Sequence, residues 1–111
     1  MFAELLQYFF QKYIYMKLKS IERTPNNKKA FVATFIKDDG KEKIQRFGTG
    51  SNFVLNKNKT LEDRKNYIAR HRVNENFNDP ITAGSLSRHL LWGDSRSLQK
   101  NISSFKKQFK I

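Results

Sequence analysis

The sequence of 111 residues contains no cysteine. Without thiols the chain forms neither a disulfide nor a thiolate metal site, and this composition fits a reducing intracellular setting. Acidic residues are also scarce, because ten Asp and Glu stand against 22 Lys and Arg. No apolar run reaches the roughly 20 residues that a membrane-spanning helix needs. These absences exclude a disulfide scaffold and give no indication of a transmembrane segment.

Motifs that indicate an enzyme are missing as well. His71 and His89 lie far apart in the sequence and have no metal-ligand spacing, so structural roles are expected for both. The loop Gly48–Asn52 lacks the Gly-Lys-Ser/Thr of a P-loop and is not a dinucleotide fingerprint. The candidate acid–base carboxylates stand where helix caps and turns are expected: Glu62, Asp63, Glu75 and Asp79. The sequence therefore predicts a protein that is not an enzyme, without a cofactor, a metal site or a small-molecule substrate.

Positive charge is the strongest feature of the composition. The formal net charge is +12, with 11 basic and 4 acidic residues in positions 17–60 and 10 basic and 5 acidic residues in positions 61–111. A folded domain with such an excess repels itself, and a polyanionic partner compensates for this. Nucleic acid is the first expectation. Acidic protein surfaces or anionic lipid headgroups meet the same requirement, and a compositional bias toward Lys and Asn is the alternative without function.

The first half of the chain predicts a small antiparallel sheet within residues 16–47. Both sides of residues 28–37 are apolar, which is typical of a central strand. A turn at Pro25-Asn26-Asn27 precedes it, and Asp38-Asp39-Gly40 is a strong hairpin signal before a third strand at Lys41–Phe47. The glycine-rich loop from Gly48 is expected to lead from the sheet into a helical half.

Three helices are predicted near residues 60–73, 83–92 and 96–109. Thr60 and Asp63 resemble a capping box for the first, and Thr82 and Gly93 are expected to begin and end the second. In the first helix, apolar contact is expected from Leu61, Tyr67 and Ile68. In the third, an apolar stripe is formed by Leu98, Ile102, Phe105 and Phe109. The fold class predicted is α+β, and the segment 76–93, with a buried Trp92, is expected to be its packing centre.

Residues 1–15 differ from the rest, because they are apolar almost all round. We expect an additional helix there, outside a single basic domain of residues 16–111. Docking on the core or on a partner is the first interpretation, and a peripheral membrane anchor is the second. Translation from Met16, with residues 1–15 as an upstream extension, is the third.

Basic side chains beside aromatic ones indicate where a polyanion would bind. Lys and Arg on a helix can contact successive phosphates, which gives affinity that depends on salt and not on base sequence. Tyr67 could in addition stack on bases. The alternative is that Arg64, Arg70 and Arg72 form ion pairs with Glu62, Asp63 or Glu75 on the same helix or its neighbours. The candidate nucleic-acid-binding residues are Arg64, Lys65, Arg70, Arg72, Arg88, Lys100, Lys106 and Lys107.

Residues 64–92 carry a family resemblance. The motifs YIARHR, NDPITAG and SRHLLW occur together there, with Arg46-Phe47-Gly48 upstream and a helix at Ile102–Phe109 downstream. Together they resemble a small family of basic proteins encoded by large nucleocytoplasmic DNA viruses of algae and amoebae. The resemblance covers about residues 17–110 of this chain. Phe77 and His89 depart from the pattern, so no family role is carried over to His89.

The resemblance implies a viral protein in the virion or the infected host cell and implies no activity. Together with the charge, it predicts a non-catalytic, virion-associated protein that organises DNA through nonspecific phosphate contacts. The alternative is a minor capsid or core protein whose basic surface meets acidic viral proteins or the inner membrane.

Overall fold

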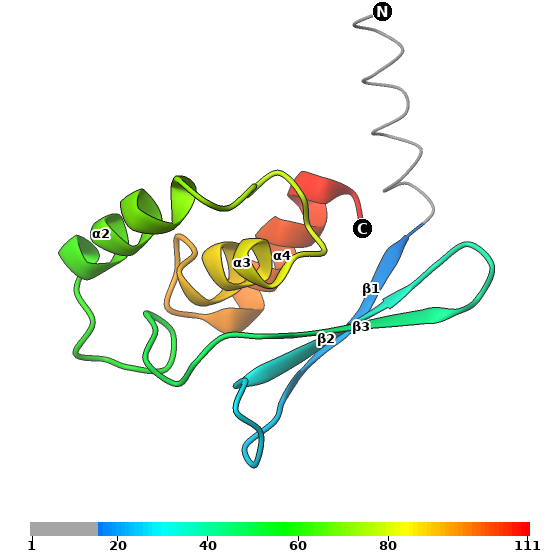
Figure 1. Cartoon of the computed structure of the whole chain (residues 1–111), viewed down its shortest axis with the longest axis horizontal. Helices are drawn as coiled ribbons and strands as arrows, with labels where there is room; N and C mark the ends of the chain where they lie inside the picture. The colour runs from blue at the N-terminus through cyan, green and yellow to red at the C-terminus, as the bar shows by residue number, and fades with distance from the viewer. Residues whose placement is uncertain (1–15) are drawn as a thin grey trace, which may run out of the picture.

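The computed structural model describes residues 16–111, and the helix predicted for residues 1–15 lies outside the described residues. Within the described range, a three-stranded sheet is followed by a helical half, which confirms the α+β prediction (Figure 1). The elements in chain order are β1 (Lys17–Arg23), β2 (Phe31–Ile36), β3 (Glu42–Phe47), α2 (Leu61–Arg72), α3 (Ala83–Leu86), the π-helix η1 (Ser87–Leu91) and α4 (Leu98–Phe109).

The sheet is antiparallel in the order β1-β2-β3, so β2 is the central strand as predicted. Its start is later than expected, because Lys29 belongs to the preceding turn, where its N–H donates to Asn27 Oδ1 and its carbonyl accepts from Thr24 Oγ1. The hairpin between β2 and β3 closes at Gly40, whose φ of +83° is a conformation that favours glycine. Local turn chemistry thus sets the register of the sheet.

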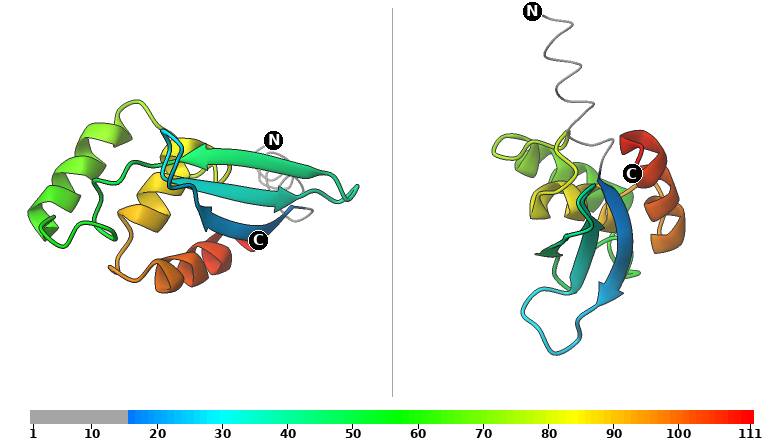
Figure 2. Two further views of the ribbon diagram at one scale, coloured as in Figure 1. Left: turned by 90° about the horizontal axis from the view of Figure 1, so that it is seen from below. Right: turned by 90° about the vertical axis from the view of Figure 1, so that its right-hand side faces the viewer.

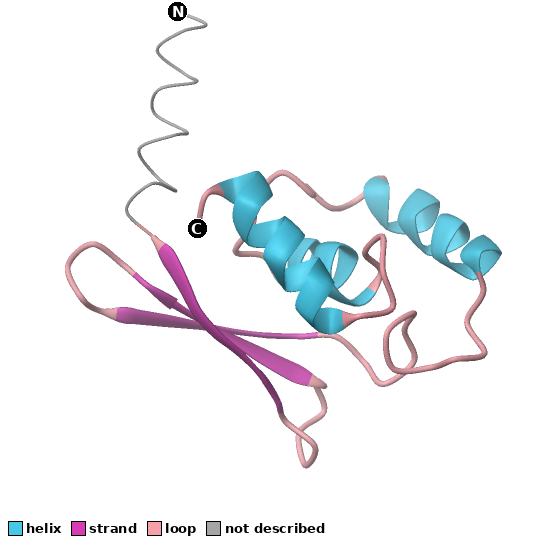
Figure 3. Cartoon of the chain, turned by 180° about the vertical axis from the view of Figure 1, so that it is seen from behind, coloured by secondary structure: helices cyan, strands magenta, loops and turns pink. Residues whose placement is uncertain are grey.

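The two faces of the sheet differ in their environment. Along β2, Phe31, Ala33 and Phe35 are buried, while the alternate residues are only partly covered. Seen from behind and from the side, the helices all lie on one side of the strands (Figures 2 and 3). On the other side Ile44, the partner of Thr34, is 59% exposed. The helical segments α3, η1 and α4 therefore cover one face of the sheet, and no described helix covers the other.

The core forms where the covered face meets the helical half. Side chains from all three strands pack there against α3, η1 and α4. Its largest fully buried apolar side chains are Phe31, Phe35, Phe47, Phe105, Leu86, Leu90 and Leu91. The end of the chain joins it too, because Ile111 is buried and its carbonyl accepts from the N–H of Leu18 at 3.1 Å.

Gly48 fixes the crossing from the sheet to the helices, as the loop prediction expected. Its φ is +82°, and an added Cβ would lie 2.4 Å from Leu91 Cδ1. Asn52 then shapes the loop, because its Nδ2 donates to the Thr49 carbonyl and its Oδ1 accepts from the N–H groups of Val54 and Leu55. The buried side chain of Asn52 replaces the regular backbone pairing that the loop lacks.

The helix predicted for residues 83–92 is divided into two parts. Thr82 caps α3 as predicted, since its Oγ1 accepts from Ser85 N. The chain then widens into η1, where the N–H of Trp92 donates to the carbonyl of Ser87 five residues earlier. Gly93 does not end the helix by a left-handed conformation. Its role is close packing, because a Cβ there would lie 2.4 Å from the carbonyl oxygen of His89.

Helix α2 begins as the sequence predicts and packs less than expected. Thr60 and Asp63 form the capping box, with both hydrogen bonds present. None of its residues is buried, and Leu61, predicted to make apolar contact, is 71% exposed. The reason is position: Leu61 does not share the face of Tyr67, which packs against the core. Helix α2 is therefore a mostly solvated basic helix.

Candidate nucleic-acid interface

Arg64 is tied to the end of η1 and does not stand free in solvent. Its Nε donates to the carbonyls of Trp92 at 3.1 Å and Gly93 at 2.8 Å, and its Nη2 contacts Asp94 Oδ1 at 2.6 Å. Arg88 adds a bond from Nη1 to the Trp92 carbonyl at 3.0 Å. Because the last carbonyls of a helix have no partner within it, these two arginines act as its C-terminal cap.

Arg72 lies near the two arginines of the cap, Arg64 and Arg88. Burial lowers the pKa of Arg88, and the neighbouring charge of Arg64 lowers it further, as does that of Arg72, while Asp94 opposes the effect. Arg88 also borders a cleft that it shares with Arg72. Arg64, Arg72 and Arg88 thus form one positively charged cluster, although they come from two elements.

The remaining predicted residues of α2 lie at the surface of the helix, and two of them also border hollows: Arg70 lines a pocket beside Gly48, and Arg72 lines the cleft at Arg88. Lys65, Arg70 and Arg72 are exposed, and no ion pair of any of them occurs within residues 16–111. None of the predicted pairs with Glu62, Asp63 or Glu75 is formed in this range, and the carboxylate that Arg64 engages is Asp94. We call Lys65, Arg70 and Arg72 the α2 surface.

A second basic surface lies on α4. Lys100, Lys106 and Lys107 are exposed there, and we call them the α4 surface. Helix α4 packs against η1 through Phe105, while α2 lies on the other side of α3 and η1 (Figure 2). The eight predicted residues therefore do not form one continuous patch. They divide into the α2 surface beside the Arg64 and Arg88 cap, and the α4 surface across the helical layer.

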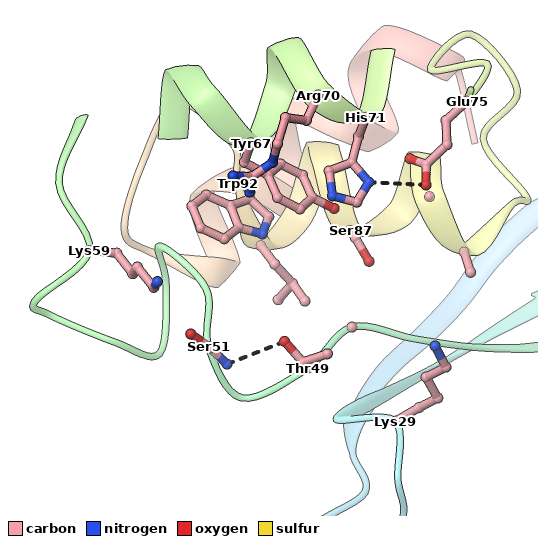
Figure 4. A pocket seen from close by; sticks show the side chains of 14 residues that line it. Lys29, Thr49, Ser51, Lys59, Tyr67, Arg70, His71, Glu75, Ser87 and Trp92 are labelled. Atoms are coloured by element: carbon pink, nitrogen blue, oxygen red, sulfur yellow. Dashed lines mark hydrogen bonds and ion pairs between the residues drawn. The ribbon is translucent and has the colours of Figure 1, made fainter. Parts of the chain in front are cut away.

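Tyr67, considered above as a base-stacking residue, already has a ring on each face. Trp92 stacks on it at a centroid distance of 4.3 Å and His71 at 4.0 Å. Two rings this close must lie on opposite faces of Tyr67, and Figure 4 shows the three rings in a row. Burial raises the pKa of Tyr67 to about 12, with the charge of Glu75 adding to the effect. Tyr67 therefore attaches α2 to the buried Trp92, which confirms the packing role expected for Trp92.

The two histidines have separate surroundings, as their sequence spacing suggested. His71 Nδ1 lies 3.3 Å from Glu75 Oε1, and His89 Nε2 lies 2.8 Å from the Phe77 carbonyl. Burial lowers the pKa of His89, which a hydrogen bond to the Phe77 carbonyl partly opposes. Within residues 16–111, no group of three His, Cys, Asp or Glu side chains comes together in a way that could hold a metal ion.

Two further polar residues hold the site and were missed from the sequence. Arg96 places its guanidinium 3.9 Å from the Phe53 ring centroid and donates to the carbonyls of Phe53 and Lys59. Asn101, buried on α4, donates to the carbonyls of Leu90 and Ser95 at 2.9 and 2.7 Å. The only signal for Asn101 is a polar residue beside the apolar stripe of α4. Neither residue has a motif that reveals its partner.

Comparison of this chain with protein-family models, curated proteins and solved structures finds no match. The resemblance to the viral family therefore stays a prediction. No helix among residues 16–111 is long and apolar enough to cross a bilayer. The candidate interface is therefore inferred from the geometry of α2 alone. This helix is basic and mostly exposed, and it is held to the rest of the protein by the bonds of Arg64 and by the stacking of Tyr67 on Trp92.

Proposed function

We propose that this protein binds nucleic acid, DNA in the first place, through phosphate contacts made by the α2 surface. The observation that carries the proposal is the state of Lys65, Arg70 and Arg72, which are exposed and without an ion pair among residues 16–111. Such cations release counterions from a phosphate backbone without first breaking an internal contact. The binding is non-catalytic and independent of base sequence.

The shape of the interface supports the same function. Helix α2 buries none of its residues, so its solvent-facing side is open to a partner. The neighbouring Arg88 and Arg64 add positive potential beside it, although their donors are engaged by carbonyls. The α4 surface offers a second line of contact for a long polyanion. In the setting implied by the family resemblance, the protein organises DNA in a virion or an infected cell.

The test is retention on duplex DNA at low and rising salt. Replacing Lys65, Arg70 and Arg72 by Gln is expected to remove most of the retention without unfolding, because none of the three side chains has a structural partner in the described chain. A matched control removes three exposed charges around the β2–β3 hairpin, at Lys37, Lys41 and Lys43, and is expected to retain binding. Wild-type protein that ignores DNA at low ionic strength refutes the proposal.

The second candidate is a structural protein that meets an acidic coat protein or a membrane. The observation that favours it is the open face of the sheet, where Ile44 is 59% exposed beside the half-buried Val32, Thr34 and Ile36. Exposed apolar surface that no described helix covers offers a contact for a partner protein. Replacement of Ile44 by Lys discriminates the two functions, because it disrupts assembly on this face and leaves DNA binding intact.

A further inference from the structure

A pocket of about 430 Å³ lies between α2 and the glycine-rich loop. Its helix side carries the row of Trp92, Tyr67 and His71, with Glu75 beyond it, and its loop side carries Thr49 and Ser51 (Figure 4). Three cationic side chains line it as well: Lys29, Lys59 and Arg70. Its volume lies in the range of about 300–1,000 Å³ that is usual for small-ligand sites.

Glu75 brings a carboxylate to the edge of the pocket. Oε1 of the carboxylate contacts His71 Nδ1 at 3.3 Å, while Oε2 is enclosed and has no hydrogen-bond partner among the described residues. An enclosed polar atom without a partner is energetically unfavourable, and more so when it is charged. Oε2 itself is enclosed against Gly84, while the side chain as a whole keeps 30% of its surface exposed, so a donor in the pocket approaches the exposed side of Glu75 and not Oε2.

Gly84 makes room for this carboxylate. A Cβ at position 84 would lie 2.4 Å from Glu75 Oε2 and 2.5 Å from its Cδ. The chain therefore needs the absence of a side chain there if Glu75 is to keep its position. A carboxylate held against a backbone in this way, at the edge of a pocket, is an arrangement that capping or turn formation does not require.

The pocket thus contains groups of both charges, three cationic side chains and one carboxylate. Lys29, Lys59 and Arg70 form no ion pair among residues 16–111 and attract an anion. A metal cation would be repelled by the three basic side chains, whereas an anion would be attracted by them and repelled only by Glu75. A ligand that carries a negative group and a separate N–H donor satisfies both sides.

We propose that this pocket holds one unpaired nucleotide of a single-stranded nucleic acid, with the amino group of the base at Glu75 and the phosphate at the cationic side chains. The inference rests on the proposed nucleic-acid function and deepens it. The Watson–Crick edge is available only when a nucleotide is unpaired, and single strands are read on that edge. Cytosine offers an amino donor to a carboxylate, while uracil presents a carbonyl oxygen at the same position.

The experiment compares two single strands whose bases differ in the exocyclic group at C4 and in the proton on N3. Fluorescein-labelled oligo(dC) and oligo(dU) of equal length are titrated with the full chain, and fluorescence anisotropy gives both dissociation constants. We expect oligo(dC) to bind about tenfold more tightly, which corresponds to about 1.4 kcal/mol. The Glu75→Gln variant is expected to bring the two constants to within about twofold of each other, while Lys106→Gln weakens both strands equally.

The outcomes separate this inference from the function on which it rests. Equal affinity of the wild-type chain for both strands, together with retention on duplex DNA, overturns the pocket and leaves the proposed function standing. No binding to any of the three nucleic acids overturns both. A Glu75→Gln variant that keeps the full preference for oligo(dC) also overturns the pocket. If that variant does not fold, competition of cytidine and uridine monophosphate for the wild-type chain replaces it, and equal competition refutes the proposal.

Discussion

Replacement of Arg64 by Gln separates a structural arginine from a phosphate-binding one. In the wild type its guanidinium bonds the carbonyls of Trp92 and Gly93 and the carboxylate of Asp94. In the variant, Trp92 keeps a donor because Arg88 still reaches it at 3.0 Å. The buried Gly93 loses the only side-chain donor that its carbonyl has among the described residues. The cost of the change therefore centres on a single carbonyl.

The magnitude follows from burial. The side chain of Arg64 is 20% exposed, and a carbonyl left without a donor in such a place costs about 1–3 kcal/mol. Asp94 is 97% exposed, so its ion pair adds at most about 1 kcal/mol. We expect a total loss of about 2 kcal/mol in the free energy of unfolding. For a domain of this size that corresponds to a decrease in Tm of roughly 8 °C.

The assay is urea and thermal unfolding followed by circular dichroism. Lys65→Gln is the matched control, because it removes the same charge from the next residue of α2, where the side chain is exposed. It is expected to change stability by less than about 0.5 kcal/mol. If Arg64→Gln is as stable as Lys65→Gln and loses DNA affinity to the same extent, the structural assignment of Arg64 is wrong.

Three further predictions concern residues that stabilise the fold around the site. Gly48→Ala should cost at least about 2 kcal/mol, because it combines a φ of +82° with contact to Leu91, whereas Gly50→Ala has open space around it and is the control; urea unfolding measures both. Asn101→Ala should cost about 2–3 kcal/mol in the same assay, because two carbonyls lose their donor. His89 has a lowered pKa in the folded chain, so its stability contribution is complete above its ordinary value of 6.5 and is lost as pH falls through the folded value. The variant His89→Gln should therefore show a shallower loss of stability between pH 7 and pH 5.

The sheet and the helix starts are predictable from sequence because their signals are local. Gly40 must adopt a positive φ in a tight hairpin, and Thr60 with Asp63 needs only three residues to form a capping box. The π-helix at Ser87–Leu91 has no such signal, because the hydrogen bond from Trp92 to Ser87 depends on tertiary packing at the end of the helix. Local sequence signals therefore predicted where the elements lie, but they did not predict the change of helix type within residues 83–92.

The candidate site was harder to predict, because the sequence alone does not distinguish an arginine with a structural role from one that binds a ligand. Arg64 shares a helix face with Tyr67 and His71, at spacings of three and seven residues, and that face is the one that packs. This spacing could have identified Arg64 as structural. Glu75 continues the same stripe four residues after His71, beyond the end of α2, and it lines the pocket. The contacts of Arg96 with the loop depend on tertiary structure alone.

The most direct measurement of the central claim is the salt dependence of binding to duplex DNA. Each phosphate contact contributes about 0.9 to the slope of log K against log salt concentration. Replacing Lys65, Arg70 and Arg72 by Gln should therefore reduce the magnitude of the slope by about 2.7 relative to the wild type. Replacing Lys37, Lys41 and Lys43 should leave the slope unchanged. Equal slopes for the wild type and the α2 variant would contradict the claim that the α2 surface is the interface.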